Sequence, residues 1–192
     1  PFLSITNVEI LQRLIDIGNT NCFISFVTNG SIIPSEKITN LLRNFKTNIC
    51  FSIDGIGDVF EYMRYPLSWK VCQNAIEWAK ANNFDISVSY TVSNVNVWYY
   101  NETTEWFSKN GIPYLVNPVY FPKHFALNSL TKSTKSNLLS TTPELTDYFL
   151  TDGITEEEWS TTKKEILHQD ALKQIKIHDY MPYACNMMGI DN

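Results

Sequence analysis

The sequence predicts an α/β fold made of parallel β/α repeats, followed by a helical C-terminal segment. Segments of helical periodicity alternate with short apolar runs four times along the chain. Two of these runs end in small polar clusters, Thr28-Asn-Gly30 and Ser52-Ile-Asp-Gly55, as is typical of buried parallel strands. Such alternation with right-handed crossovers gives a parallel sheet, either doubly wound or curled toward a barrel.

The first helix is expected at residues 7–18, where Thr6 and Glu9 form a capping box and Gly18 can close the end. Later helices, each with one apolar face, are expected at residues 34–45, 68–82 and 98–110. Apolar or alternating runs predict strands at residues 22–27, 49–53, 85–93 and 114–119.

The C-terminal part carries helical patterns only. Helical pieces are expected at residues 132–139, 143–150 and 155–177, and Thr155 with Glu158 forms a capping box on the last of them. We therefore divide the chain into a β/α core, residues 1–125, and a helical extension, residues 126–192.

Composition narrows the class of protein. With 192 residues, 44% of them hydrophobic and 18% charged, the chain is long enough to bury a core of its own. A net charge of −5 argues against binding to nucleic acid, which a basic patch usually marks. No apolar stretch approaches the roughly 20 residues of a membrane span, and no signal-peptide pattern is present, so we expect a cytoplasmic protein.

The four cysteines are spaced too irregularly for a zinc ribbon or a CxxC motif. We expect buried thiols at Cys22, Cys50 and Cys72. Cys185 lies in a tail that is not obviously helical. It could be one ligand of an auxiliary cluster, but a single cysteine cannot hold one, and we favour a structural role.

Polar side chains gather at the carboxyl ends of the predicted strands, the edge where parallel sheets keep their ligand sites. For Asn29-Gly30 and for Asn94, the demands of a turn are a sufficient explanation. An arginine near a hydroxyl and a carboxylate, as in Ser52, Asp54 and Arg64, instead suits a zwitterionic ligand that has a carboxylate and a ribose.

The order of these motifs resembles that of the radical S-adenosylmethionine (radical SAM) enzymes, especially their SPASM and twitch subgroups. Thr28-Asn-Gly30, Ser52-Ile-Asp-Gly55 and Arg64-Tyr-Pro66 carry the resemblance, and Pro1-Phe-Leu-Ser-Ile resembles the end of that family's Gly-Gly-Glu-Pro motif. The similarity covers roughly residues 1–140 and becomes specific only through the order and spacing of the motifs.

The resemblance implies the C-terminal part, strands three to six, of a partial (β/α)6 TIM-like barrel. By the family's pattern, Ser52 and Arg64 hold the methionyl carboxylate of S-adenosyl-L-methionine, Asp54 lies near the ribose or the substrate, and Val92 packs against adenine. Asp54 could equally cap its own turn. Thr28 and Asn29 complete the expected cofactor-binding residues.

The family also uses a [4Fe-4S] cluster held by a CxxxCxxC motif, which this sequence lacks. We expect those ligands upstream of residue 1, which makes the chain a fragment that is inactive alone; no metal ligand or catalytic residue is assigned within it. The implied partners are a peptide or small-molecule substrate and an electron donor such as a flavodoxin or ferredoxin, with neither nucleic acid nor membrane.

Two alternatives stay open. One is a binding or protein-interaction module of partial-barrel fold that has lost the cluster and exposes apolar surface where earlier strands would pair. The other is an unrelated barrel enzyme, which is disfavoured because no strand end supplies a lysine nucleophile or a Gly-rich phosphate loop. An unpaired first strand should also make the isolated chain prone to aggregate.

Overall fold

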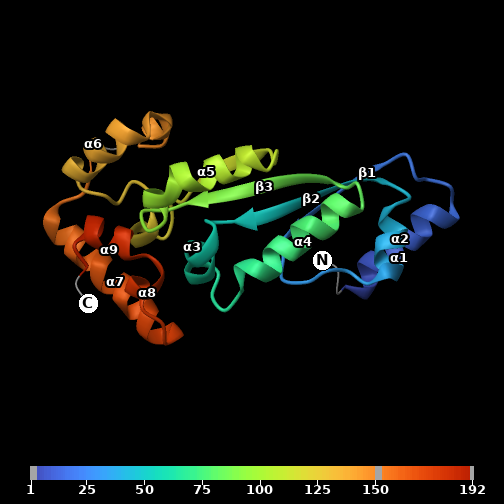
Figure 1. The fold of residues 1–192 in the computed structure, drawn as a ribbon, viewed down its shortest axis with the longest axis horizontal. Coiled ribbons are helices and arrows are strands. Elements are labelled where there is room, and N and C mark those ends of the chain that lie inside the picture. Colours follow the sequence, from blue (N-terminus) through green and yellow to red (C-terminus); the bar gives the residue numbers. More distant parts are fainter. Residues whose placement is uncertain (1–3, 150–152, 191–192) are drawn as a thin grey trace.

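The computed structural model describes residues 4–149 and 153–190. Among them is one sheet of four parallel strands in the order β1-β2-β3-β4, so that neighbours in the sequence are neighbours in the sheet (Figure 1). The strands are β1 (Phe23–Thr28), β2 (Lys46–Ile53), β3 (Asp85–Val92) and β4 (Tyr114–Pro118). The predicted α/β fold with parallel repeats is confirmed.

Helices connect the strands and form the C-terminal segment. In the core they are α1 (Ile5–Asp16), α2 (Glu36–Leu42), α3 (Gly57–Met63), α4 (Trp69–Ala81) and α5 (Tyr100–Lys109), with short 3-10 turns η1 (Val97–Tyr99) and η2 (Lys123–Phe125). In the extension they are α6 (Lys132–Thr141), η3 (Pro143–Tyr148), α7 (Glu156–Lys173), α8 (Ile177–Tyr180) and α9 (Pro182–Met188).

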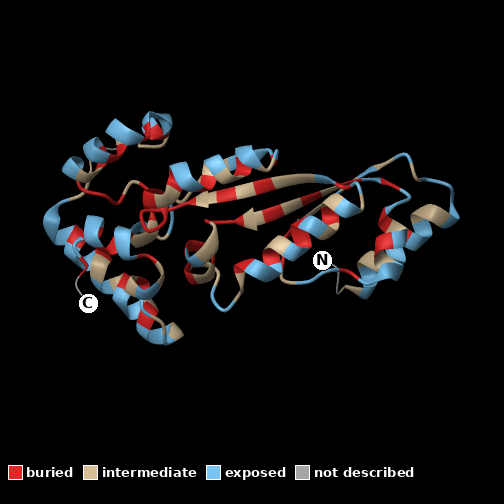
Figure 2. Ribbon diagram, in the orientation of Figure 1, coloured by how far each residue is buried: buried red, intermediate tan, exposed pale blue. Residues whose placement is uncertain are grey.

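Only one face of the sheet is well covered. Alternate residues of β2, such as Ile49, Phe51 and Ile53, are buried, whereas those between them are half-buried, and β3 follows the same rule (Figure 2). A doubly wound sheet would bury both faces under helices. The alternation therefore favours a sheet curled toward a barrel, with helices outside and an open inner face.

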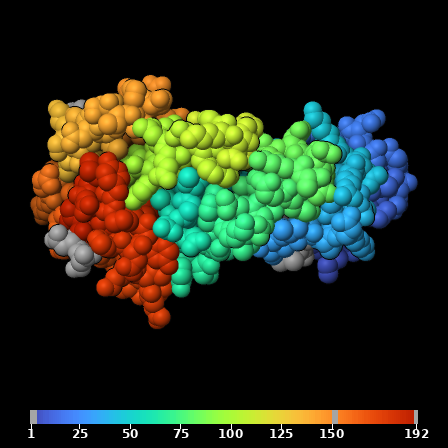
Figure 3. Space-filling model, in the orientation of Figure 1, coloured from blue at the N-terminus to red at the C-terminus, as the bar shows by residue number. Residues whose placement is uncertain are grey.

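The molecule is elongated, with the N-terminal helices at one end and the C-terminal helices at the other (Figures 1 and 3). The arrowheads of β2 and β3 point toward α3 and the C-terminal helices. The helical extension thus lies at the carboxyl edge of the sheet, where ligand sites of parallel folds are found.

A buried polar contact ties this extension to the core. The Tyr62 hydroxyl of α3 donates to Asp170 Oδ1 of α7 at 2.7 Å, and the Ile177 amide at the start of α8 donates to Asp170 Oδ2 at 2.6 Å. Burial, and then the hydrogen bond to Asp170, raise the pKa of the Tyr62 hydroxyl. A single hydrophobic cluster also includes residues of both parts, from Leu11 to Ile190. The division at residue 125 stays a prediction.

Local signals explain most element boundaries. The αL residues Gly18 and Gly111 follow α1 and α5, and Thr155 forms the predicted capping box on α7. The predicted capping box on the first helix is wrong, because Ser4 caps α1 and accepts a hydrogen bond from the Asn7 amide at 3.4 Å.

Other expectations fail where helices are short or broken. No sequence pattern indicated α3 or α9. The tail around Cys185, which was expected to be irregular, is helical because it forms α9. The single helix expected at residues 155–177 ends at Lys173, because Gln174 is left-handed (φ 59°), and α8 follows as a separate turn. The helix expected at residues 143–150 is the 3-10 turn η3, and Leu150 lies outside the described residues.

Among the helices of residues 4–149 and 153–190, none is both long and apolar enough to cross a lipid bilayer.

Candidate functional site

An ion pair marks the carboxyl end of β2. Arg64 Nη2 donates to Asp54 Oδ1 at 2.8 Å, and Arg64 Nε lies 2.7 Å from Asp54 Oδ2. The Asp54 side chain is 10% exposed and that of Arg64 is 23% exposed, so the pair is shielded while the guanidinium still reaches the surface. The structure therefore brings together two of the three residues that the sequence singled out for a zwitterionic ligand.

The turn between β2 and α3 makes this pairing possible. A Cβ atom on Gly55 would lie 2.2 Å from Val59 Cγ1, so only glycine lets α3 fold back this closely onto the end of β2. Two turns later the helix ends at Met63, and Arg64 follows as its C-cap. The short helix thus returns Arg64 to the aspartate that precedes it by ten residues.

Asn96 fixes the ends of β2 and β3 relative to each other. Its fully buried amide donates to the backbone carbonyl of Asp54 and, at 2.8 Å, to that of Thr91. Its side-chain oxygen accepts from the Ser93 amide at 2.7 Å and the Ser93 hydroxyl at 3.0 Å. Asn96 is therefore a structural clamp that holds the backbone beneath the ion pair.

Asn94 also has a structural role, but through contacts far along the chain and not through the local turn bonds that the turn interpretation predicts. It is fully buried, and its amide donates to the carbonyls of His124 at 2.9 Å and Ser129 at 3.3 Å. These bonds tie the end of β3 to the segment after β4.

Ser52 lies on the open face of the sheet. It is half-buried within β2, whereas Asp54 follows the end of that strand and is buried. No hydrogen bond joins its hydroxyl to another of the described side chains or backbone groups. Ser52 is thus available to a ligand on that face.

Hydrogen bonds between polar side chains also cross the strands on this open face. The Asn48 amide donates to Ser25 Oγ at 3.2 Å and to Ser87 Oγ at 3.1 Å, and the Asn117 amide donates to Ser89 Oγ at 2.8 Å. A cavity of about 550 Å³ lies over this face. Its lining is mainly apolar, with Val27, Val88 and Leu115, and Ser87, Ser89 and Asn117 add polar groups.

Thr28 and Asn29 shape the turn after β1. Thr28 Oγ1 accepts from the Gly30 amide at 3.3 Å, and Asn29 Oδ1 accepts from the Ser31 amide at 3.2 Å and its hydroxyl at 2.8 Å. Thr28 is buried and Asn29 is exposed. The turn interpretation accounts for these contacts, while the Asn29 amide nitrogen points to no described acceptor.

Val92 lies on the other side of the sheet. Its side chain is fully buried, on the face that also buries Val88 and Tyr90. The structure therefore does not bring the Val92 side chain together with Ser52, Asp54 and Arg64.

The cysteines lie in separate elements. Cys72 and Cys185 are buried, whereas Cys22 and Cys50 are only half-buried, so the expectation of burial is wrong for these two. Cys50 lines the cavity over the open face. Burial raises the pKa of the Cys72 thiol to about 12, against the opposing effect of the Arg64 charge, and burial also raises the pKa of Cys185. Burial thus disfavours the thiolate form of both side chains.

No group of three or more His, Cys, Asp or Glu side chains that could hold a metal ion occurs within the described ranges, 4–149 and 153–190.

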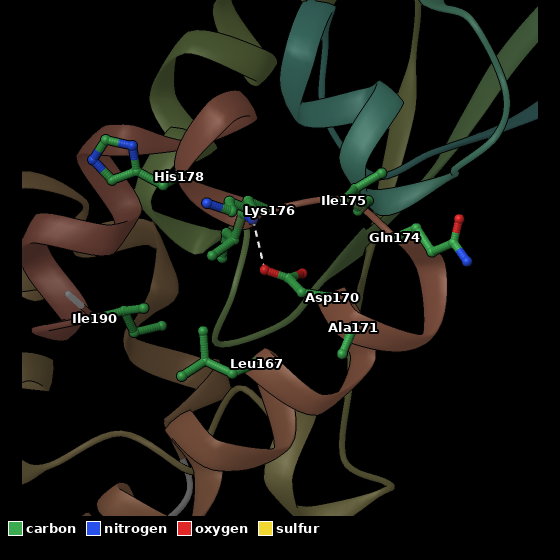
Figure 4. A pocket seen from close by; sticks show the side chains of 9 residues that line it. Leu167, Asp170, Ala171, Gln174, Ile175, Lys176, His178 and Ile190 are labelled. Atoms are coloured by element: carbon green, nitrogen blue, oxygen red, sulfur yellow. Dashed lines mark hydrogen bonds between the residues drawn. The ribbon is translucent and has the colours of Figure 1, made fainter. Parts of the chain in front are cut away.

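A second apolar cavity, of about 400 Å³, lies within the extension (Figure 4). Leu167, Ala171 and Ile190 contribute apolar walls, and Asp170 lies at its side. Because both carboxylate oxygens of Asp170 already accept hydrogen bonds, this residue anchors α8 and is not a free ligand group.

Sequence comparisons give no relatives: no protein-family model matches the chain, and no curated protein matches it significantly. Solved structures do match. Native anSMEcpe with bound AdoMet and Cp18Cys peptide superposes with a TM-score of 0.55 at 18% identity. The match covers 74% of this chain and 43% of that one. The likeness shows that this chain has the fold of part of that protein.

Two further structures agree. Hexahistidine-tagged anSMEcpe with bound AdoMet has a TM-score of 0.51 at 20% identity, covering 74% of this chain and 41% of that one. Native anSMEcpe with bound AdoMet and Kp18Cys peptide has a TM-score of 0.51 at 18% identity, covering 74% and 43%. The chain thus spans less than half the length of these proteins, and the likeness concerns the fold.

Sequence reasoning missed the contribution of the extension to this edge. Gln169 and Lys173 of α7 line a small cavity there together with Met63 of α3 and Ser93. Nothing in the local pattern of α7 signals this position, because only the tertiary packing on α3 creates it.

Proposed function

We propose that this chain is part of a radical SAM enzyme that binds S-adenosyl-L-methionine at the carboxyl edge of the sheet, beside the Asp54–Arg64 pair. The observation that carries the proposal is this shielded ion pair, which follows Ser52 at the carboxyl end of β2, in a fold similar to that of AdoMet-bound structures. Fold similarity alone would not fix an activity.

The available donor and acceptor groups fit the cofactor. Its methionyl carboxylate suits the guanidinium of Arg64, which keeps N–H donors beyond those directed at Asp54, and the free hydroxyl of Ser52. Asp54 orients Arg64 and can accept from a ribose hydroxyl. Thr28 and Asn29 flank the site from the neighbouring strand. Because the side chain of Val92 is buried, we propose that it supports the adenine side through the backbone of β3.

The described cysteines do not fit a [4Fe-4S] cluster, since they lie in separate elements and two are buried thiols with raised pKa values. We therefore place the cluster ligands in a CxxxCxxC motif upstream of residue 1. When bound to such a cluster in its reduced form, the cofactor supplies a radical that abstracts hydrogen from a substrate. The electron would come from a flavodoxin or ferredoxin, in a cytoplasmic setting.

A peptide is the substrate we favour over a small molecule. Two of the similar structures hold peptides, which motivates this choice. Membership of the SPASM or twitch subgroup, and the inactivity of the isolated chain, belong to the same proposal.

Equilibrium dialysis with radiolabelled S-adenosyl-L-methionine tests the site. Arg64→Gln should weaken binding at least about tenfold, because it removes a charge-assisted hydrogen bond. Ser52→Ala, which keeps the ion pair, should weaken binding about threefold to tenfold. Arg43→Gln is the matched control: Arg43 pairs with Glu36 on the outside of α2, and its loss should leave binding unchanged.

Circular dichroism shows whether each variant is folded. Wild-type binding that neither Ser52→Ala nor Arg64→Gln changes would refute the site, and a folded wild-type chain that binds no cofactor would refute the proposal for this chain.

An interaction module is the second candidate function. Phe23 and Val27 of the edge strand β1 are 57% and 63% exposed, and Leu115 of β4 is 69% exposed. Exposed apolar residues on an edge strand favour association with another chain. This candidate predicts self-association or partner binding without cofactor binding in the dialysis experiment.

A further inference from the structure

A small apolar cavity adjoins the proposed cofactor site. It has a volume of about 290 Å³ and lies where the end of β3, the segment after β4, α3 and α7 meet. Met63, Val95, Val119 and Phe125 contribute apolar walls. This volume is near the lower limit of about 300 Å³ for ligand pockets, so the cavity suits one or two side chains and not a whole ligand.

The residues that line the cavity are directly connected to the ion pair. Met63 immediately precedes Arg64, and Ser93, another lining residue, is held by the Asn96 side chain that also binds the Asp54 carbonyl. A group in the cavity would therefore lie next to the proposed cofactor site and not at a remote surface.

One wall carries a positioned positive charge. Lys173 Nζ lies 5.2 Å from the centre of the Tyr62 ring, a cation–π contact, and Tyr62 is itself held by Asp170. No carboxylate of the described residues forms an ion pair with Lys173. Gln169, one turn earlier on α7, lines the same wall.

The segment after β4 that lines the cavity also carries two exposed aromatic residues. Tyr120 is 53% exposed and Phe121 is 87% exposed, and both lie between the lining residues Val119 and Pro122. Aromatic side chains are enriched at binding hot spots, and large apolar surface is otherwise costly to leave in water. Tyr120 and Phe121 therefore add exposed aromatic surface to the segment that lines the cavity.

We infer that this cavity binds an apolar side chain of a peptide, and that Lys173 selects peptides in which a carboxylate follows that side chain. The inference rests on the proposed function only in its choice of a peptide. The apolar walls explain the preference for an apolar side chain. The Lys173 ammonium has no carboxylate partner among the described residues, so charge complementarity explains the preference for a carboxylate after that side chain.

Methyl NMR of the 192-residue chain tests this inference. The chain has four methionines, so ¹³C-methyl-methionine labelling gives four signals. Met63 reports on the cavity, Met187 of α9 is exposed outside it, and a Met63→Leu variant assigns the reporter. The probes are three capped peptides: Gly-Gly-Leu-Asp-Gly-Gly, the same with Asn for Asp, and the same with Ala for Leu.

The Leu-Asp peptide should shift the Met63 signal and leave that of Met187 unchanged. Replacing Leu by Ala in the peptide should weaken binding about tenfold, and replacing Asp by Asn about threefold to fivefold. Lys173→Gln should abolish the preference for Asp, whereas Lys164→Gln, an exposed lysine on the same helix, should retain it.

An unshifted Met63 signal, an equal shift at Met187, or equal binding of all three peptides by the wild type would overturn the inference. The peptide comparison needs no variant, so a misfolded Lys173→Gln protein would not prevent the test. Because the titration contains no cofactor, its failure is distinct from failure of the dialysis experiment, and Arg64→Gln should lose cofactor binding while Met63 still responds to peptide.

Discussion

Replacing Asn96 with alanine should destabilise the protein strongly. The fully buried side chain forms four hydrogen bonds, to the carbonyls of Asp54 and Thr91 and from the amide and hydroxyl of Ser93. At about 1 kcal/mol for each bond, the free energy of unfolding should fall by about 3–5 kcal/mol. Asn96→Asp should cost a comparable amount, since it directs a carboxylate at two carbonyls.

Urea unfolding, followed by tryptophan fluorescence and far-UV circular dichroism, measures this effect. Asn101→Ala is the control: Asn101 is exposed and donates one bond, to the Thr141 carbonyl at 3.0 Å, so its loss should cost no more than about 0.5 kcal/mol. A loss below about 1 kcal/mol for Asn96→Ala would refute the role of Asn96 as a clamp between the strand ends.

Three further predictions concern the β1 turn and the cysteines. Gly30→Ala should lower the free energy of unfolding, measured in urea, by about 2–4 kcal/mol, because φ of Gly30 is +71° and the new Cβ would lie 2.7 Å from Cys72 Sγ. Adding Cys72→Ala to this variant should recover part of the loss. If the effects of the two substitutions were fully additive, the clash would be contradicted. At pH 8 a thiol reagent should modify Cys22 and Cys50 well before Cys72 and Cys185, and simultaneous modification of all four would contradict the assigned burial. The pKa of Cys72 is raised above its ordinary value of 9.0 to about 12, so the stability that the neutral thiol contributes is complete below pH 9 and is lost as the pH rises toward 12. Cys72→Ala should therefore flatten the dependence of the unfolding free energy on pH in this range. An unchanged dependence would contradict the burial of the thiol.

The alternation of strands and helices was predictable because each long element has a clear period. α4 and β3 lie within one or two residues of their expected bounds. α3 was not predicted because it has only seven residues and two glycines lie at its start. Packing decides its conformation, since Val59 and Phe60 are buried against the core.

The site was predictable to the extent that its parts are close in sequence. Asp54 and Arg64 are ten residues apart, and both lie in the segment that follows the predicted strand at residues 49–53. Tyr62 and Asp170 are 108 residues apart, and no local pattern could pair them. The position of Lys173 beside the cavity depends on that same docking of α7 onto α3, so sequence reasoning could not reach it.

The coding sequence upstream of Pro1 tests the central claim most directly. Translation in frame should give Gly-Gly-Glu immediately before Pro1 and a CxxxCxxC motif some tens of residues earlier, because the proposed enzyme needs cluster ligands that the described residues do not supply. A start codon close to Pro1, with no cysteine triad before it, would contradict the radical SAM proposal for this protein and favour the interaction module.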